Sequence, residues 1–199
     1  MKFVINGVLF LLLLVLSILA GCTQPQSPVS TPAPAVLTTA GTGTNLSQLM
    51  LSPREYPFIP VSIRTQVPDM RDPTISQFGG IRGLAQYAIN QPIPSNTSTQ
   101  IGQMIVEYPQ GKASLAYDAF VNQTRNADQS QYTLTWLSDP GIGEKSSAFT
   151  VTDRTGKNNP MVMIVYVKSG FMESVTMIAP SEDARNLSLI ARTTAAKMQ

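Results

Sequence analysis

The side chains that could perform chemistry in this chain are limited by the lack of histidine and by a single cysteine, Cys22. Zinc sites of the histidine or cysteine type, Ser-His-Asp triads and Cys-His dyads all need groups that the sequence does not contain. Carboxylate chemistry, a Ser-Lys pair or the binding of a hard cation through oxygen atoms remain available. No alternation of Asp and Asn before a glycine indicates a calcium loop. The sequence therefore predicts no metal site, no cofactor and no catalytic residue.

Two glutamates, Glu107 and Glu173, lie inside runs that have the pattern of β-strands. A carboxylate that faced the core there would be costly unless it were paired, and outward exposure is the usual position for such a residue. If either one instead faced a groove over the sheet, it could bind a cation or a polar ligand. Glu107 and Glu173 are therefore the candidate ligand-groove residues. The methionines between Met161 and Met177 could line an adaptable apolar pocket, although core filling is their commoner use.

A glycine-rich stretch, Gly141 to Ser146, superficially resembles a phosphate-binding loop. Only one residue separates its glycines, Glu144 interrupts the Gly-Lys-Ser order, and a strand pattern rather than a helix follows. We expect a tight turn between strands. Lys145 beside Ser146 could be a Ser-Lys hydrolase pair, but no Ser-x-x-Lys element accompanies it, and a solvated turn lysine is the simpler interpretation.

The position of Cys22 indicates attachment rather than catalysis. Lys2 is followed by an apolar run that ends in Leu19-Ala20-Gly21-Cys22, and a basic start, a short apolar core and small residues are typical of an export signal. The last four residues resemble the lipobox of prokaryotic lipoproteins. The resemblance implies cleavage after Gly21 and a thioether-linked lipid on Cys22. An uncleaved anchor helix is the alternative, although the apolar run is short for a membrane span.

The stretch from Thr23 to Thr44 has no charged and no aromatic residue and consists mainly of Thr, Ser, Pro, Ala, Gly and Gln. Such a segment cannot bury enough apolar surface to fold. We therefore divide the chain into a signal peptide (1–21), a disordered Pro/Ser/Thr-rich linker that starts at the lipidated Cys22 (22–44) and one domain (45–199). As a flexible coil the linker would span about 25 Å, which exceeds a Debye length of about 8 Å.

Charge is sparse in this chain. Charged residues make up 13% of the sequence and the formal net charge is +2, whereas about 25% charged residues is usual. Because there is no basic stripe or polybasic patch, we expect neither a nucleic acid partner nor binding to anionic lipid.

Four Asn-x-Ser/Thr sequons offer candidate glycosylation sites. Asn45 and Asn96 fall in expected loops and are the better acceptors, whereas Asn122 and Asn186 fall on expected helices. Modification requires a source that glycosylates exported proteins.

Hydrophobic periodicity predicts helices at 46–51, 112–125 and 181–198. Strands are expected at 81–89, 101–108, 132–136, 147–153, 161–167 and 171–179, with one edge strand at 61–67. Five prolines between residues 53 and 73 argue against any helix from 53 to about 78. This order predicts the α+β class, with an antiparallel sheet of about six strands flanked by helices.

The order of elements resembles the extracytoplasmic lipoprotein and kinase-sensor domains of the LpqN and PknH type and, more distantly, the PsbP-like fold. The resemblance spans residues 46–198. It rests on Glu55-Tyr56-Pro57, on Ala113-x-x-Ala116-Tyr117-x-x-Phe120, on the turn from Asp139 to Ser146, on the hairpin through Gly170 and on a closing helix that ends near Lys197. It implies a non-enzymatic binding or sensing module with a groove over the sheet. The chain departs from some of these sensor domains by lacking their cysteine pairs.

We therefore expect a lipid-anchored protein on the extracytoplasmic face of a cell membrane, whose single domain binds a small ligand or an envelope protein and is not an enzyme. One alternative is a hydrolase of envelope polymers, which would need two carboxylates about 5 to 9.5 Å apart in one groove. The other alternative is a structural surface protein. A groove with convergent carboxylates would favour the enzyme, whereas an apolar pocket would favour binding.

Overall fold

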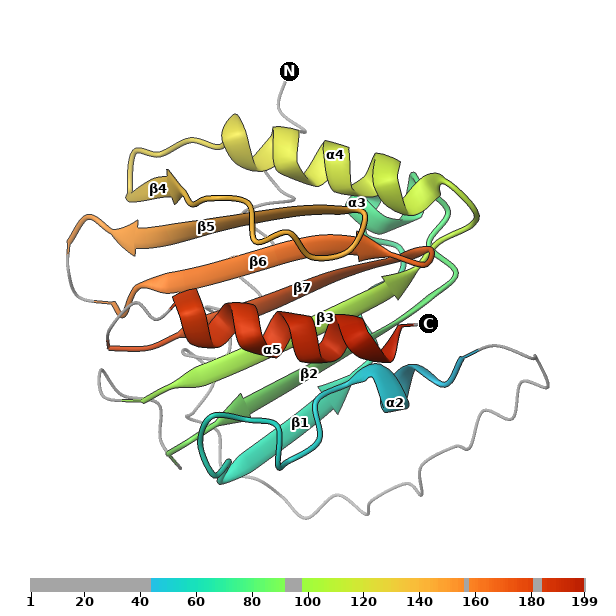
Figure 1. Cartoon of the computed structure of the whole chain (residues 1–199). Coiled ribbons are helices and arrows are strands. Elements are labelled where there is room, and N and C mark those ends of the chain that lie inside the picture. The colour runs from blue at the N-terminus through green and yellow to red at the C-terminus, as the bar shows by residue number, and fades with distance from the viewer. Residues whose placement is uncertain (1–43, 92–97, 156–157, 181–183, 199) are drawn as a thin grey trace, which may run out of the picture.

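The computed structural model describes residues 44–91, 98–155, 158–180 and 184–198. These residues form seven strands and four helices, an α+β fold (Figure 1). In chain order the elements are α2 (Leu46–Leu49), β1 (Ser62–Gln66), α3 (Pro73–Ser76), β2 (Arg82–Ile89), β3 (Gln100–Glu107), α4 (Lys112–Arg125), β4 (Tyr132–Trp136), β5 (Lys145–Asp153), β6 (Met161–Lys168), β7 (Phe171–Ile178) and α5 (Ala184–Lys197).

All seven strands join one antiparallel sheet in the order β1-β2-β3-β7-β6-β5-β4. The last strand, β7, lies between β3 and β6 and so connects the two halves of the sheet. The edge strand expected at 61–67 is present as β1, which pairs with β2, and with it the sheet has seven strands against the expected number of about six. The apolar run of β6 is buried along nearly its whole length, as its sequence predicts.

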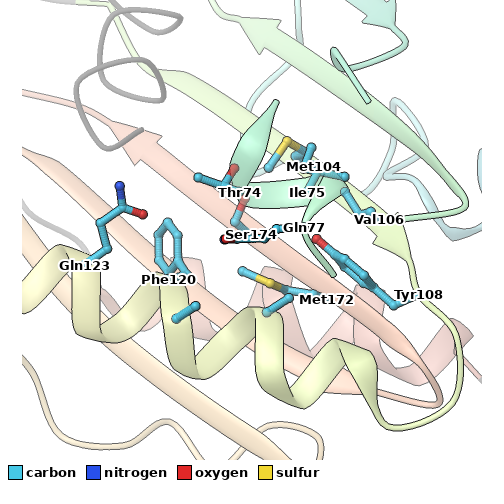
Figure 2. Close-up of a pocket in the computed structure, with 12 residues that line it drawn as sticks. Thr74, Ile75, Gln77, Met104, Val106, Tyr108, Phe120, Gln123, Met172 and Ser174 are labelled. Atoms are coloured by element: carbon cyan, nitrogen blue, oxygen red, sulfur yellow. The ribbon is translucent and has the colours of Figure 1, made fainter. Parts of the chain in front are cut away.

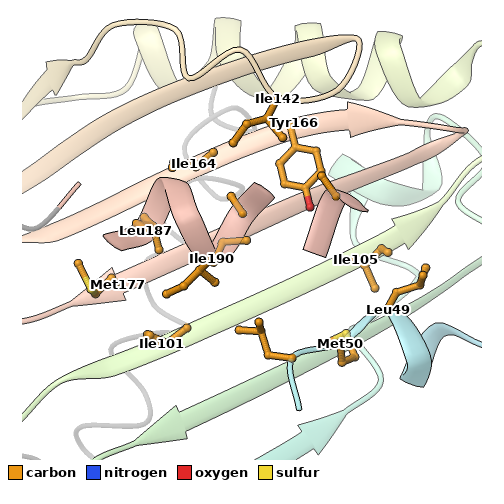
Figure 3. Close-up of a cluster of buried hydrophobic side chains, with 14 of the residues drawn as sticks. Leu49, Met50, Ile101, Ile105, Ile142, Ile164, Tyr166, Met177, Leu187 and Ile190 are labelled. Carbon is orange, nitrogen blue, oxygen red and sulfur yellow. The ribbon is translucent and has the colours of Figure 1, made fainter. Parts of the chain in front are cut away.

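Helices cover both faces of the sheet (Figure 1). α5 packs on β6 and β7 from one side, and α2 lies against α5 and β2 on that same side. α4 packs on β6 and β7 from the other side, next to α3. Each face therefore has its own hydrophobic core, and the core beneath α5 includes Ile105, Ile164 and Leu187 (Figure 3).

The helix α3 corrects the expectation that the proline-rich stretch contains no helix. Pro73 occupies the first turn of α3, where a backbone N–H would have no intrahelical acceptor. Asp72 caps the helix, because its Oδ1 accepts a hydrogen bond from Thr74 N at 2.8 Å. A proline at this position starts a helix rather than preventing one.

The predicted turn at Ser169-Gly170 is confirmed, with φ values of 52° and 82° between β6 and β7, as expected of a two-residue hairpin loop. The predicted start of the last helix at Ser181 lies outside the described residues. Within the described ranges, no helix has the length and apolar character needed to cross a bilayer.

Candidate functional site

A shallow apolar groove lies on the α4 side of the sheet, between α4 and α3 (Figure 2). Its space of about 500 Å³ includes open solvent at the mouth. The floor is formed by residues of β3 and β7 and by the residue after β3, namely Met104, Val106, Met172, Ser174 and Tyr108. The walls are formed by α3 and its C-cap and by α4, through Thr74, Ile75, Gln77, Ala116, Ala119, Phe120 and Gln123.

The pleat of the sheet places the floor residues together. Across the β3–β7 ladder, Met104 is paired with Ser174 and Val106 with Met172. Successive side chains of a strand point to opposite faces, so these four share the α4 side while their strand neighbours point toward α5. The floor is therefore fixed by the register of two central strands.

The wall formed by α3 depends on two local features. The Asp72 carboxylate accepts hydrogen bonds from Thr74 N at 2.8 Å and from Thr74 Oγ1 at 2.6 Å. Gly80 then lets the chain return closely past the helix, because a Cβ at Gly80 would lie 2.4 Å from a methyl group of Ile75. A side chain at position 80 would push Ile75 away from its present position in the wall.

The groove is electrically neutral. Among the lining residues, none carries a carboxylate, ammonium or guanidinium group. Burial, followed by the charge of Asp72, raises the pKa of the Tyr108 phenol to about 12, so this phenol is uncharged at neutral pH. The amide and hydroxyl groups of Gln77, Gln123 and Ser174 supply polar contacts. An uncharged ligand with an apolar body and a few hydrogen-bonding groups matches this lining.

Glu173, expected to be exposed, is 0% exposed beneath α5, so that expectation is wrong. Its carboxylate accepts a hydrogen bond from Gln103 Nε2 at 2.9 Å and another from Tyr166 Oη at 2.6 Å. Burial raises the pKa of Glu173 to about 7, although the hydrogen bonds from Tyr166, Thr194 and Gln103 act in the opposite direction. The neutral donors around it explain why a carboxyl group can occupy the core.

Glu107 lies at the end of β3 in an ion pair with Arg82 and keeps 26% of its side chain exposed. The pairing of Ile105 with Glu173 puts the two glutamates on one side of the sheet, diagonally across the β3–β7 ladder. Neither glutamate lines the groove between α3 and α4. Because Glu173 is sealed from solvent, the two carboxylates do not form a site that a substrate could reach, and their ligand-groove role stays a prediction.

Residues 141–144 connect β4 to β5, as predicted, and Gly141 and Gly143 have φ values of 61° and 66°, whereas Lys145 and Ser146 already belong to β5. Asp139 Oδ1 accepts hydrogen bonds from the first glycine's N–H and from Ser146 Oγ. Lys145 forms an ion pair with Asp118 of α4, with Nζ 2.7 Å from Oδ2. The lysine is therefore committed to a surface pair rather than simply solvated.

The remaining predicted sites lie at the edge of the described structure or beyond it. Cys22 and Asn96 fall outside the described residues. Asn45 is exposed, and its Oδ1 caps α2 by accepting a hydrogen bond from Ser47 N at 3.1 Å. Within the described ranges, no group of three His, Cys, Asp or Glu side chains could hold a metal ion. Glycosylation of Asn45 and Asn96 stays a prediction.

The comparisons with known proteins give a likeness to solved structures alone. No protein-family model matches the chain, and no curated protein matches it. Among solved structures, the extracellular domain of PknH from Mycobacterium tuberculosis matches with a TM-score of 0.46 and 14% sequence identity, over 71% of this chain and 77% of that chain.

Sequence reasoning missed Gln103 and Tyr166, the two hydrogen-bond partners of Glu173. The signal for Gln103 was present, because Ile101, Gln103 and Ile105 alternate at the period of a strand and must share a face. Tyr166 stands in a run that is apolar at every position, which hides the direction of each side chain. The resemblance implies a groove over the sheet, but its place between α3 and α4 was missed because α3 was not expected.

Proposed function

We propose that this protein is a lipid-anchored, non-catalytic binding module on the extracytoplasmic face of a cell membrane, and that the groove between α3 and α4 holds an uncharged, largely apolar ligand. The observation that carries the binding role is the neutral lining of the groove over Met104 and Met172. Methionine side chains adapt to apolar ligands of different shape. The lipid anchor is supported by Leu19-Ala20-Gly21-Cys22 and by the uncharged sequence that follows it.

The hydrolase alternative is not supported by the arrangement of carboxylates. It requires two carboxyl groups that reach one substrate, but Glu173 is fully buried and Glu107 is ion-paired with Arg82. The groove itself contains no acid or base that titrates near neutral pH. A binding role therefore fits the described residues better than glycoside or ester hydrolysis.

Mass spectrometry of the membrane-extracted protein tests the anchor. We expect the mature chain to start at Cys22 and to carry the mass of a thioether-linked lipid, and we expect C22S to lack that mass. An intact Met1 together with an unmodified Cys22 would remove the anchor from the proposal without affecting the groove.

Co-purification tests the groove separately. Ala119 lines it, and A119W would fill it, whereas L115W places the same ring on α4 at a side chain that is 49% exposed and outside the lining. We expect an uncharged small molecule to be extracted with the wild type and with L115W, at least tenfold less with A119W. Equal recovery from all three proteins, or recovery of no compound from any, would contradict the ligand assignment.

A further inference from the structure

The segment by which the chain enters the domain, residues 44–51 (the entry segment), buries Leu46, Leu49, Met50 and Leu51 in the core beneath α5 and is also bound to the sheet through its backbone. Three successive carbonyl groups accept hydrogen bonds from side chains: Leu49 O from Gln103 at 3.2 Å, Met50 O from Lys197 at 2.8 Å and Leu51 O from Gln86 at 2.7 Å. Leu51 N donates to Gln103 Oε1 at 2.8 Å. The entry segment is thus held by polar groups that would be left without partners if it detached.

Gln103 links the entry segment to the buried carboxyl group. Its Oε1 accepts from the entry segment, while its Nε2 donates both to the entry segment, at Leu49 O, and to Glu173 Oε1. This division fixes the orientation of the amide, because a flipped amide would place its NH₂ group against the N–H of Leu51. A change in the protonation state of Glu173 therefore acts directly on Gln103, which holds the entry segment.

The surroundings of Glu173 can satisfy both of its protonation states. The ionised carboxylate accepts hydrogen bonds from Gln103 and Tyr166. When Glu173 is protonated, its O–H can donate to Tyr166 Oη, which lies 2.8 Å from Thr194 Oγ1 and can donate to it, while Thr194 donates to Ala191 O at 3.1 Å. Because both protonation states of Glu173 have hydrogen-bond partners, the desolvation cost of the ionised form determines which state is favoured.

Few charges face Glu173 to offset that desolvation. From α5, the Lys197 ammonium lowers the pKa of Glu173, but it is paired with Glu55 at 2.7 Å. From β6, Tyr166 faces it as a neutral phenol whose own pKa is raised by burial. At the end of β3, Glu107 is paired with Arg82 of β2. Within the described part of the chain, ionisation thus leaves a negative charge in the core with no cation paired to it.

We propose that Gln103, Glu173, Tyr166 and Thr194 form a pH-sensitive latch: a neutral Glu173 keeps the entry segment closed on the sheet, and its ionisation favours a state in which the segment detaches and water reaches the carboxylate. The entry segment also buries apolar side chains in this core, but its helix α2 has only four residues, whereas α5 has 14 residues and packs on β6 and β7 along its length. We therefore take the entry segment as the element that opens.

The latch predicts a defined dependence of opening on pH. Glu173 has a pKa of about 7 when closed and the ordinary value of 4.5 when exposed. The opening equilibrium should therefore rise about tenfold per pH unit between 4.5 and 7, about 300-fold in total, and become constant above pH 7.

Hydrogen exchange on the full chain in detergent micelles tests this, with rates corrected for the intrinsic effect of pH. We expect amides of the entry segment to be less protected than those of β6 at every pH. Their opening equilibrium should rise about tenfold per pH unit between 4.5 and 7 and become constant above pH 7. E173Q, which mimics the neutral acid, should remove the pH dependence, and E107Q should retain it. Y166F removes a hydrogen-bond donor to the ionised carboxylate and should therefore raise the pKa of Glu173. The opening equilibrium of Y166F should become constant at a higher pH than that of wild type, which provides a second test if E173Q does not fold.

Three outcomes would overturn the latch. The first is a corrected protection of the entry segment that does not change with pH. The second is an equal pH response in wild type and E173Q. The third is a single protection factor shared by the entry segment and β6 at each pH, because the opening would then be global unfolding.

Discussion

Replacing Glu173 with Gln should change how the stability of the whole domain depends on pH. The pKa of Glu173 is about 7 in the folded protein, whereas the ordinary value for an exposed glutamate is 4.5. Because the folded value is raised, the stability associated with the protonated group is complete below pH 4.5, falls as pH rises from 4.5 to 7 and is lost above that range. At about 1.4 kcal/mol per pH unit, the loss amounts to about 3 kcal/mol.

Gln at position 173 resembles the protonated acid, since its carbonyl can accept from Gln103 and its NH₂ group can donate to Tyr166 Oη. The difference in the free energy of unfolding between wild type and E173Q should therefore shift by about 3 kcal/mol between pH 4.5 and pH 8, in favour of E173Q at the higher pH. Urea titrations at several pH values, followed by the fluorescence of Trp136, the chain's one tryptophan, measure this difference.

Other carboxyl groups contribute to the pH profile with the opposite sign. Hydrogen bonds, chiefly from Ser146 and Thr155, lower the pKa of Asp139 and Asp153, but both groups are present in wild type and E173Q and cancel in the difference. E107Q serves as the control, because Glu107 is partly exposed at the end of β3. A difference between wild type and E173Q that stays constant within about 1 kcal/mol from pH 4.5 to 8 would refute the reasoning.

Three further substitutions, two of them with a matched control variant, test the packing by urea unfolding. G143A should cost about 3 kcal/mol, because position 143 has φ +66° and an added Cβ would lie 2.2 Å from a carbonyl oxygen of β6, whereas G141A, at φ +61° with open space, should cost about 1 kcal/mol. T124V should be neutral or stabilise by up to about 1 kcal/mol, because the buried Thr124 hydroxyl has no hydrogen-bond partner among the residues that the structure describes. L187A should cost about 2 to 5 kcal/mol at a fully buried position, whereas L189A, at a side chain that is 66% exposed, should change stability by less than about 0.5 kcal/mol.

The fold was largely predictable because most elements carry a strong local signal. The helix at 112–125 has one apolar face and a turn before it, and the structure places α4 at Lys112–Arg125. The hairpin through Gly170 needed a residue that tolerates positive φ, and Gly170 supplies it. α3 was not predicted because its single turn is too short for periodicity to show and because Pro73 was taken as a helix breaker. Only the cap at Asp72 could have revealed it.

The site was harder to predict because its parts depend on pairings between distant strands. Glu173 lies in a strand where alternation alone does not say which face is buried, and the default for a carboxylate is exposure. Hydrogen bonds from Gln103 of β3 and Tyr166 of β6 offset the cost of burying this carboxyl group, and they form only when the two strands lie beside β7. Those pairings are properties of the sheet order, which places β7 between β3 and β6, and no local pattern specifies that order.

The groove and the latch share the backbone of the same two strands. Met104 and Ser174 lie on the floor of the groove, while the adjacent Gln103 and Glu173 take part in the latch on the opposite face. A change in the spacing of β3 and β7 would therefore alter both, so a loss of ligand in a groove variant can be assigned to the groove only if the pH response of the entry segment is unchanged. Residue 119 belongs to α4 and not to β3 or β7. A119W therefore separates the two sites better than a substitution of Met104, which is next to Gln103 on β3.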